Sequence, residues 1–478
     1  MITLLMITVP LLIGACVWLT GKHLRWQITL LNLGAVLNCV GTLLLWLKPQ
    51  WDEFLMPNAK SLIGQDFLSR TVVSIVSLLF LLASLQTVKY FPMVRKKFEQ
   101  NAERFLSPRV VAVCLLGFLS SMTLVASSRN FGLLWVAMEA TTLASAPLII
   151  FKRTGDSLEA MWKYILLCSV GIGFALFGTM LLAVAGEGSH AGMDMNLLGM
   201  SNLNPGWFKA AFVFILAGYG TKMGLAPFQA WMPDAYSEAP GVLSVLSSGG
   251  LLACSFLGVV RVLAVAPAEV KGFCVTLMLI LGVFSLALAA FFILRQSDYK
   301  RMLAYSSMEH MGLCAVLWAL GLEGVALIHI VVHALLKVVL FMTADNIQLA
   351  YSSQKISSIS GLLGSIRRNA VIYLVGVLML CGMPPSPLFV TELLLIKAAN
   401  PVLGAVILLL LFIVFAGMTS HVMNMCMGKK SPAAVPAGEL KALERLSFIP
   451  GWVLTVVVLS GAVLIAGIIA IEFKLINW

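Results

Sequence analysis

The chain has 478 residues, of which 60% are hydrophobic and only 11% are charged, and its mean hydropathy is +0.98. Soluble domains do not have this balance, so the composition predicts an all-α polytopic membrane protein. The net charge of +11 does not indicate nucleic acid binding, because the basic residues are spread through connecting loops. None of the nine cysteines forms a C-x-x-C pair, and no P-loop or G-x-G-x-x-G pattern occurs. We therefore expect no metal, no cofactor and no redox chemistry in this chain itself.

Hydrophobic runs divide the chain into fourteen predicted transmembrane helices, since one span needs about 20 apolar residues. They are 2–20, 26–47, 70–91, 108–127, 130–151, 157–186, 207–231, 238–265, 270–294, 300–321, 323–349, 367–399, 401–427 and 449–473. The seventh is predicted to break at Pro227 and Pro233, and the twelfth at Pro384 and Pro385. Proline removes a backbone donor and clashes with the preceding turn, so each pair interrupts its helix.

Lys and Arg are unevenly distributed between alternating loops. Loops after odd-numbered helices hold 19 of the 32, loops after even-numbered helices and the C-terminal tail hold nine, and four lie inside helices. Cytoplasmic loops collect basic residues. We therefore expect a multi-pass protein of a bacterial or archaeal cell (inner) membrane, with both termini outside.

The two broken helices lie five spans apart, as expected for an inverted repeat whose sites lie at the breaks. The sequence thus predicts four regions. They are 1–107 with helices one to three, 108–265 as repeat one, 270–427 as repeat two, and 428–478 as a C-terminal loop with helix fourteen.

Lys222 lies in an apolar helix just before the first break. A broken helix at membrane depth is tolerated where it lines a protein-buried or wet cavity, and intramembrane charges are usually functional. We therefore predict an ion-handling site near Lys222, the alternative being a lysine that snorkels from a helix end. Glu139, in mid-helix, is its natural partner, because a carboxylate–lysine pair can load and unload protons when its separation changes. Lys163 either joins this site or snorkels to the nearby cytoplasmic surface.

In the second half, His329, His333 and Lys337 are spaced i, i+4, i+8 and so share nearly one helical face. Histidine titrates near neutral pH and can relay protons. The alternatives are histidines satisfied in an apolar core, and a metal site, which is disfavoured because no third carboxylate or thiolate ligand is obvious. The sequence therefore predicts a proton relay on this helix.

Glu392 follows the second break and matches Lys222 by position in its repeat. Glu309 and His310 are expected to add side contacts, whereas Asp298 and Asp345 are interpreted as capping or loop residues. The predicted polar row through the bundle is Glu139, Lys163, Lys222, Lys337 and Glu392.

Five motifs carry a family resemblance: LLWVAMEATTLASAPL around Glu139, GTKMGLAPFQAWMPDAYSEAP around Lys222, KRMLAYSSMEHMG, HIVVHALLKVVLF and GMPPSPLFVTE. They resemble the antiporter-like subunits of complex I and its relatives over at least helices four to thirteen. The resemblance implies fourteen helices with two inverted five-helix repeats. It also implies proton or cation translocation driven by redox chemistry in neighbouring subunits, without catalysis in this chain. Glu139, Lys222, the central histidines with Lys337, and Glu392 match the family's translocating residues, and Lys163 matches a lysine of part of the family.

The segment SLEAMWKYILLCSVGIGFALFG and the length resemble the F-type subunit of formate hydrogenlyase-like, group 4 membrane-bound hydrogenases. This resemblance implies that the partners are other membrane subunits and a peripheral redox arm, of hydrogenase or NADH/quinone dehydrogenase type. The alternative assembly is a multisubunit Na⁺/H⁺ antiporter, and the translocated ion is H⁺ or Na⁺.

One position departs from the family pattern. Helix eight has Ala253 where the family usually carries a lysine or histidine. We expect water or the hydroxyls of Ser247, Ser248 or Ser255 to bridge the route there. The alternative is an incomplete channel in a structural subunit that does not pump.

Overall fold

The computed structural model describes residues 1–20, 23–48, 62–97, 105–187, 192–429, 431 and 443–476. Each of the fourteen predicted spans coincides with helix. Within the described ranges, 11 helices are long and apolar enough to cross a membrane, which confirms the all-α polytopic fold. Parts of the basic connectors between the predicted spans 70–91 and 108–127, and before the predicted span 449–473, lie outside the described residues.

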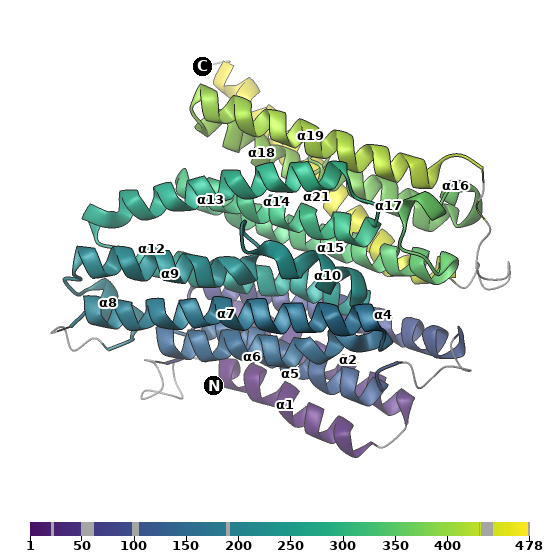
Figure 1. The fold of residues 1–478 in the computed structure, drawn as a ribbon, viewed down its shortest axis with the longest axis horizontal. Helices are drawn as coiled ribbons and strands as arrows, with labels where there is room; N and C mark the ends of the chain where they lie inside the picture. The colour runs from purple at the N-terminus through teal and green to yellow at the C-terminus, as the bar shows by residue number, and fades with distance from the viewer. Residues whose placement is uncertain are drawn as a thin grey trace. The chain divides into compact units, whose positions relative to one another are not determined.

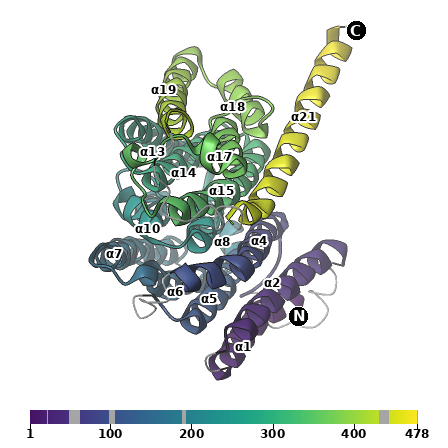
Figure 2. The ribbon, with the colours of Figure 1, turned by 90° about the vertical axis from the view of Figure 1, so that its right-hand side faces the viewer.

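The chain divides into two compact units, Met1–Met278 and Leu279–Trp478, and the division falls within α13. The main helices of unit 1 are α1 (Ile2–Leu19), α2 (Leu24–Leu47), α4 (Phe67–Lys97), α5 (Pro108–Ser127), α6 (Phe131–Ile149), α7 (Gly155–Ala185), α9 (Pro205–Met223), α10 (Met232–Glu238), α11 (Gly241–Val245) and α12 (Leu252–Ala264), with the short α8 (Met195–Gly199) between α7 and α9. Unit 2 continues from α13 (Ala268–Leu294) with α14 (Tyr299–Ala319), α15 (Glu323–Tyr351), α16 (Leu362–Ser365), α17 (Arg367–Leu380), α18 (Pro387–Ala398), α19 (Pro401–Cys426) and α21 (Phe448–Ile476). Figure 1 shows their order along the chain, and in Figure 2 α13, α14, α15, α17 and α19 of unit 2 are gathered in one group.

Glycines allow pairs of helices in each unit to approach closely. In unit 1, α7 and α9 lie side by side (Figure 1), and a Cβ atom at Gly178 or Gly218 would lie within 2.8 Å of backbone atoms of the facing helix. In unit 2, a Cβ at Gly282 or Gly312 would lie within 2.7 Å of the other glycine's carbonyl oxygen. Close packing of this kind associates helices in a membrane, where apolar side chains gain nothing by leaving the lipid.

The first helix break begins earlier than predicted. Helix α9 ends at Met223, because Gly224 adopts the left-handed conformation (φ 76°) that stops a helix. Pro227 lies in the turn after it, and Pro233 lies in the first turn of α10. A proline there loses no helical hydrogen bond, so Pro233 begins a helix and does not break one.

The second break separates α17 from α18. It contains Pro384 and Pro385, together with Gly382 at φ 70°. The following helix is capped by Ser386, whose side chain accepts from the Leu388 amide. Both breaks thus combine a left-handed glycine with proline.

Arg261 ties three helix ends together in unit 1. The count of basic residues by loop includes Arg261 among the loops after even-numbered helices, but it lies in the last turn of α12 and is only 6% exposed. Its guanidinium donates to the Ser128 and Ala126 carbonyls at the end of α5. It also bonds the Ser69 hydroxyl and lies 3.7 Å from the Asp66 carboxylate at the start of α4. Sequence reasoning missed this because the helix end is distant from its partners along the chain.

We expect Arg261→Met to destabilise the protein by roughly 3 kcal/mol, because it leaves two buried carbonyls without a donor. Asp66→Asn should cost less than about 1 kcal/mol, because the Asp66 side chain is 50% exposed and its ion pair is screened. Thermal unfolding of the purified protein in detergent measures both changes. Equal losses from the two substitutions would contradict the dominant role of the carbonyl contacts.

The Asp66 contribution should depend on pH. Burial raises the pKa of Asp66, but the charge of Arg261, the hydrogen bonds from Ser69 and the charge of Arg129 outweigh it and hold the pKa below its ordinary 3.8. A lowered pKa adds stability above the unfolded value, and this stability disappears as the pH falls through the folded value. The difference in unfolding midpoint between wild type and Asp66→Asn should therefore shrink below about pH 4. A difference that stays constant into this range would contradict the ion pair.

Candidate functional site

Lys222 is completely buried in the last turn of α9. Its amine donates to the Met138 carbonyl at 2.5 Å and to the Thr141 hydroxyl, both on α6. The Thr141 hydroxyl in turn donates to the Met138 carbonyl at 2.6 Å, so its lone pairs remain available to the lysine. The Met138 carbonyl and the Thr141 hydroxyl thus form a polar notch in α6, and this notch holds the predicted buried lysine at the first break.

Glu139 lies in this same stretch of α6, between the two residues that Lys222 contacts. It is half-buried, and its carboxylate accepts from Thr142 and from Ser169 of α7, each at 3.2 Å. Lys222 of α9 thus bonds α6 on either side of Glu139, but among the described residues no salt bridge joins the Lys222 amine to the Glu139 carboxylate, which bonds hydroxyls instead.

Lys163 is placed differently from the other predicted residues. Its side chain is 46% exposed on α7 and pairs with Glu159 at 2.6 Å and with Asp234 of α10 at 3.0 Å. It joins α7 to the helix that comes after the first break.

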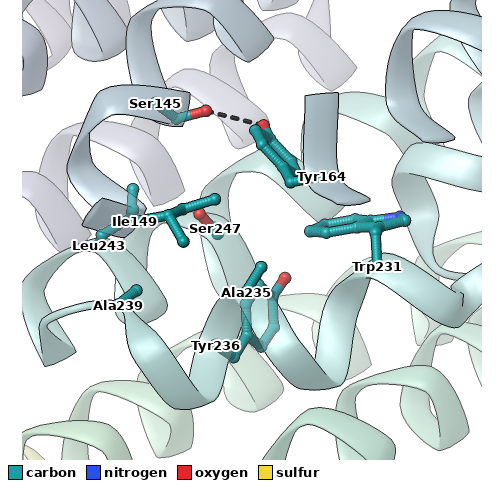
Figure 3. A pocket seen from close by; sticks show the side chains of 9 residues that line it. All are labelled: Ser145, Ile149, Tyr164, Trp231, Ala235, Tyr236, Ala239, Leu243 and Ser247. Atoms are coloured by element: carbon teal, nitrogen blue, oxygen red, sulfur yellow. Dashed lines mark hydrogen bonds between the residues drawn. The ribbon is translucent and has the colours of Figure 1, made fainter. Parts of the chain in front are cut away.

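Ser145 and Tyr164 connect the α6 segment that holds Lys222 to a small pocket, whose lining side chains are drawn in Figure 3. Ser145 bonds the Thr141 carbonyl and the Tyr164 hydroxyl, each at 2.7 Å. Tyr164 lines the pocket with Trp231, Tyr236, Ser247 and other side chains, and the cavity volume is about 10 Å³. That is the room which one water molecule needs. Trp231 also bonds the carbonyl of the residue before Lys222, which fixes the turn after α9 against the site.

A π-helical segment, Leu246–Leu251, joins α11 to α12 within the predicted span 238–265, and the sequence did not indicate it. Such segments frequently lie at functional sites. Ala253 is buried just after it. Of the predicted bridging hydroxyls, Ser247 lines the pocket and Ser255 lies 3.8 Å from the Met138 sulfur, whereas Ser248 bonds within its own helix.

Lys337 repeats the Lys222 arrangement in unit 2. It is completely buried on α15, and its amine donates to the Leu303 carbonyl at 2.8 Å and to the Ser306 hydroxyl at 2.6 Å, both on α14. The Ser306 hydroxyl donates to the Leu303 carbonyl at 2.9 Å. In both units the lysine therefore binds a carbonyl together with a hydroxyl three residues later.

His329 and His333 share the buried face of α15 with Lys337, and His310 of α14 joins them. The His310 ring centroid lies 5.1 Å from that of His329 and 5.0 Å from that of His333. His310 Nδ1 and His329 Nε2 are 3.0 Å apart, and His329 Nδ1 lies 2.8 Å from the Thr391 hydroxyl of α18. Since the Thr391 hydroxyl donates to the Leu388 carbonyl at 2.8 Å, it accepts from His329, and His329 Nε2 accepts from His310. Reversing this chain of bonds requires both histidines to change tautomer and the Thr391 hydroxyl to turn from the Leu388 carbonyl to His329 Nδ1.

Glu392 lies one residue beyond Thr391 and packs against the second break. Its carboxylate touches Gly382, which has no side chain to exclude it. Within the described part of the chain, Glu392 Oε1 and His333 Nε2 are buried without a hydrogen-bond partner. Buried polar atoms of this kind usually bind ordered water. Glu309, also buried, precedes His310 on α14.

The sequence underestimated His310, which is a central member of the histidine cluster. The i, i+4 spacing from Ser306 to His310 was the available signal, since it puts both on one face of α14. The described residues contain no group of His, Cys, Asp or Glu arranged to hold a metal ion.

The model of the NADH:quinone oxidoreductase/Mrp antiporter, TM family matches residues 128–419. This range contains both polar clusters. The Hydrogenase-4 component F homolog of Methylacidiphilum infernorum is 36% identical over 304 residues, which cover 60% of this chain and 63% of that protein. The chain aligns with 52–63% of the length of the first curated relatives.

Solved structures show the same fold. A chain of respiratory complex I from Thermus thermophilus superposes with a TM-score of 0.75 at 22% identity, covering 96% of this chain and 98% of that one. A chain of the Mrp complex from Dietzia sp. superposes with a TM-score of 0.76 at 17% identity, covering 90% and 80%. The chain is therefore an antiporter-like membrane protein that belongs to the NADH:quinone oxidoreductase/Mrp antiporter transmembrane family.

Proposed function

We propose that this protein is a proton-translocating membrane subunit of a complex I-like respiratory complex, of the membrane-bound hydrogenase type. The observation that carries the proposal is the pair of buried lysines, each held in a carbonyl–hydroxyl notch inside an otherwise apolar unit. A buried charge has a high desolvation penalty unless it is hydrogen-bonded. A lysine whose partners are few and all neutral can release its proton. Similarity to the Hydrogenase-4 component F homolog supports the assignment to a hydrogenase.

The proposed route uses Glu139 and Lys222 in unit 1 and Lys337, the histidines and Glu392 in unit 2. In unit 1, the hydroxyls from Thr141 to Tyr164 lead to a water-sized pocket. In unit 2, the bonds from His310 to Thr391 lead toward Glu392. Protons are proposed to enter from the cytoplasm near Lys222 and to leave to the outside past Glu392. Lys163 is proposed to act at the edge of the site, through Asp234 and the break.

The electrons come from partner subunits in this proposal. The partners are other membrane subunits and a peripheral redox arm, and this chain supplies only the ion path. The second candidate is a subunit of a multisubunit Na⁺/H⁺ antiporter, favoured by the structural likeness to the Mrp complex chain. An antiporter exchanges Na⁺ for H⁺ without an electron donor. NaCl added to vesicles that lack the donor should therefore change their internal pH if the chain is an antiporter subunit, and should leave it unchanged if the chain is a subunit of a redox-driven complex.

Lys222→Ala and Glu392→Gln should each reduce proton translocation by about 10²-fold, the usual loss when a positioned proton-transfer group is removed. The measurement is donor-driven acidification of membrane vesicles, divided by the amount of assembled complex. Lys209→Ala, an exposed position on α9, and Glu323→Gln, an exposed position on α15, are matched controls that should leave translocation unchanged. If both site variants translocate protons at the wild-type rate, the proposal is wrong and the chain is a structural subunit.

Gly382→Ala should impair translocation, because a methyl group there overlaps the Glu392 carboxylate. Gly321→Ala is a matched control, since Gly321 has a similar φ of 78° but open space around it. Both substitutions should cost about 1–2 kcal/mol for the left-handed backbone. Only Gly382→Ala should lower proton translocation per assembled complex, and equal effects of the two on translocation would refute the positioning of Glu392 by this break.

A further inference from the structure

A buried ion pair lies at the open end of the α14–α15 hairpin. The Lys300 amine is 2.6 Å from the Asp345 carboxylate and 2.8 Å from the Gln348 amide oxygen. The Lys300 and Asp345 side chains are 0% and 5% exposed. The count of basic residues by loop includes Lys300 among the cytoplasmic loops, and the sequence interpretation of Asp345 is a capping or loop residue; both are buried in helices.

Stability alone does not explain the pair. Desolvation of two charges offsets most of their attraction, so a buried ion pair adds little stability over well-packed apolar side chains. The hairpin end is also tied independently by backbone bonds. The Tyr299 amide donates to the Gln354 carbonyl at 3.2 Å, and the Ile356 amide donates to the Ser297 carbonyl at 2.8 Å.

The pair faces the same helix–helix seam as Lys337. Asp345 comes eight residues after Lys337, about 12 Å along the axis of α15, and both side chains contact α14. On α14, Lys300 precedes by one turn Leu303, whose carbonyl binds Lys337. The seam thus carries, in order, the ion pair, the Lys337 notch and the histidine cluster.

The other side of the pair leads to the surface. Gln348 is half-buried one turn beyond Asp345, and Ser352 and Lys355 in the following loop are exposed. The pair therefore lies between the exposed end of the hairpin and Lys337.

We propose that Asp345 carries protons between this exposed end and Lys337, and that Lys300 is its positioning residue. A proton delivered through water binds the Asp345 carboxylate, and the neutral acid separates from Lys300. The Gln348 oxygen still holds the Lys300 ammonium. The neutral acid then gives its proton, through water, to the neutral amine of Lys337. Lys337 becomes an ammonium, and the Asp345 carboxylate pairs with Lys300 again. This step rests on the proposed proton translocation and adds a residue pair to it.

The test measures donor-driven proton translocation per assembled complex in membrane vesicles. Asp345→Asn keeps the shape and an oxygen for Lys300 but cannot carry a proton in this way, and it should lose about 10²-fold. Asp345→Glu, which restores the carboxyl group, should recover a substantial part of the rate. The double variant K300M/D345M should assemble, because an apolar pair replaces a buried ion pair at little cost in stability, and should translocate as poorly as Asp345→Asn.

Asn369→Ala is the structural control, because it removes the buried 2.9 Å bond between Asn346 of α15 and Asn369 of α17. It should lower thermal stability and leave translocation per complex unchanged. The proposal is overturned if Asp345→Asn or K300M/D345M translocates like wild type while Lys337→Ala abolishes translocation. If Lys337→Ala itself translocates normally, the proposed function fails instead.

Discussion

The cost of burying a charge in an apolar helix bundle governs this structure. Lys222 and Lys337 are both completely enclosed, and each meets its need for acceptors in the same way. A carbonyl and a hydroxyl one turn apart on the facing helix receive the amine, and the hydroxyl's own hydrogen is directed to that carbonyl. Neutral acceptors of this kind hold an ammonium without trapping it in a strong ion pair, so the proton can leave. The notch therefore holds each lysine with neutral acceptors, and this is the feature on which the proposed proton translocation depends.

Helix breaks and close helix packing support these notches. In unit 1, the left-handed Gly224 ends α9 two residues after Lys222, and the Trp231 side chain then bonds the carbonyl next to the lysine. In unit 2, Gly382 provides the space into which the Glu392 carboxylate fits. A continuous helix would fill both positions with its own backbone and side chains. The breaks are thus where titratable side chains can reach polar partners at membrane depth.

The two units are also alike at two helix starts, although Lys222 on α9 and Lys337 on α15 do not occupy the same place in the two predicted repeats. Asn130 caps α6 and forms an isolated bridge with Asp194 after α7, and Asp298 caps α14 and forms one with Lys355 after α15. These helices hold the same places in the two predicted repeats, and the inverted repeat itself stays a prediction. The two units differ in the polar groups that accompany the lysine. Unit 2 adds three histidines and the Lys300–Asp345 ion pair, whereas unit 1 relies on hydroxyls and one water-sized pocket.

Much of this protein can be deduced from its sequence by itself. Hydropathy determined the spans, because one crossing of a lipid interior needs a long apolar helix, and the prolines indicated both breaks. The i, i+4, i+8 spacing determined that His329, His333 and Lys337 share one face, because that relation is local to a helix. Only the tertiary structure decided which helix each face meets. It showed that His310 completes the histidine cluster, that Arg261 and Lys300 are buried, that Lys163 lies at the surface, and that Lys222 bonds either side of Glu139. Those contacts join residues far apart in the chain, so no local spacing in the sequence indicates them. A basic residue near a helix end can be buried only where a distant segment supplies its hydrogen-bond acceptors.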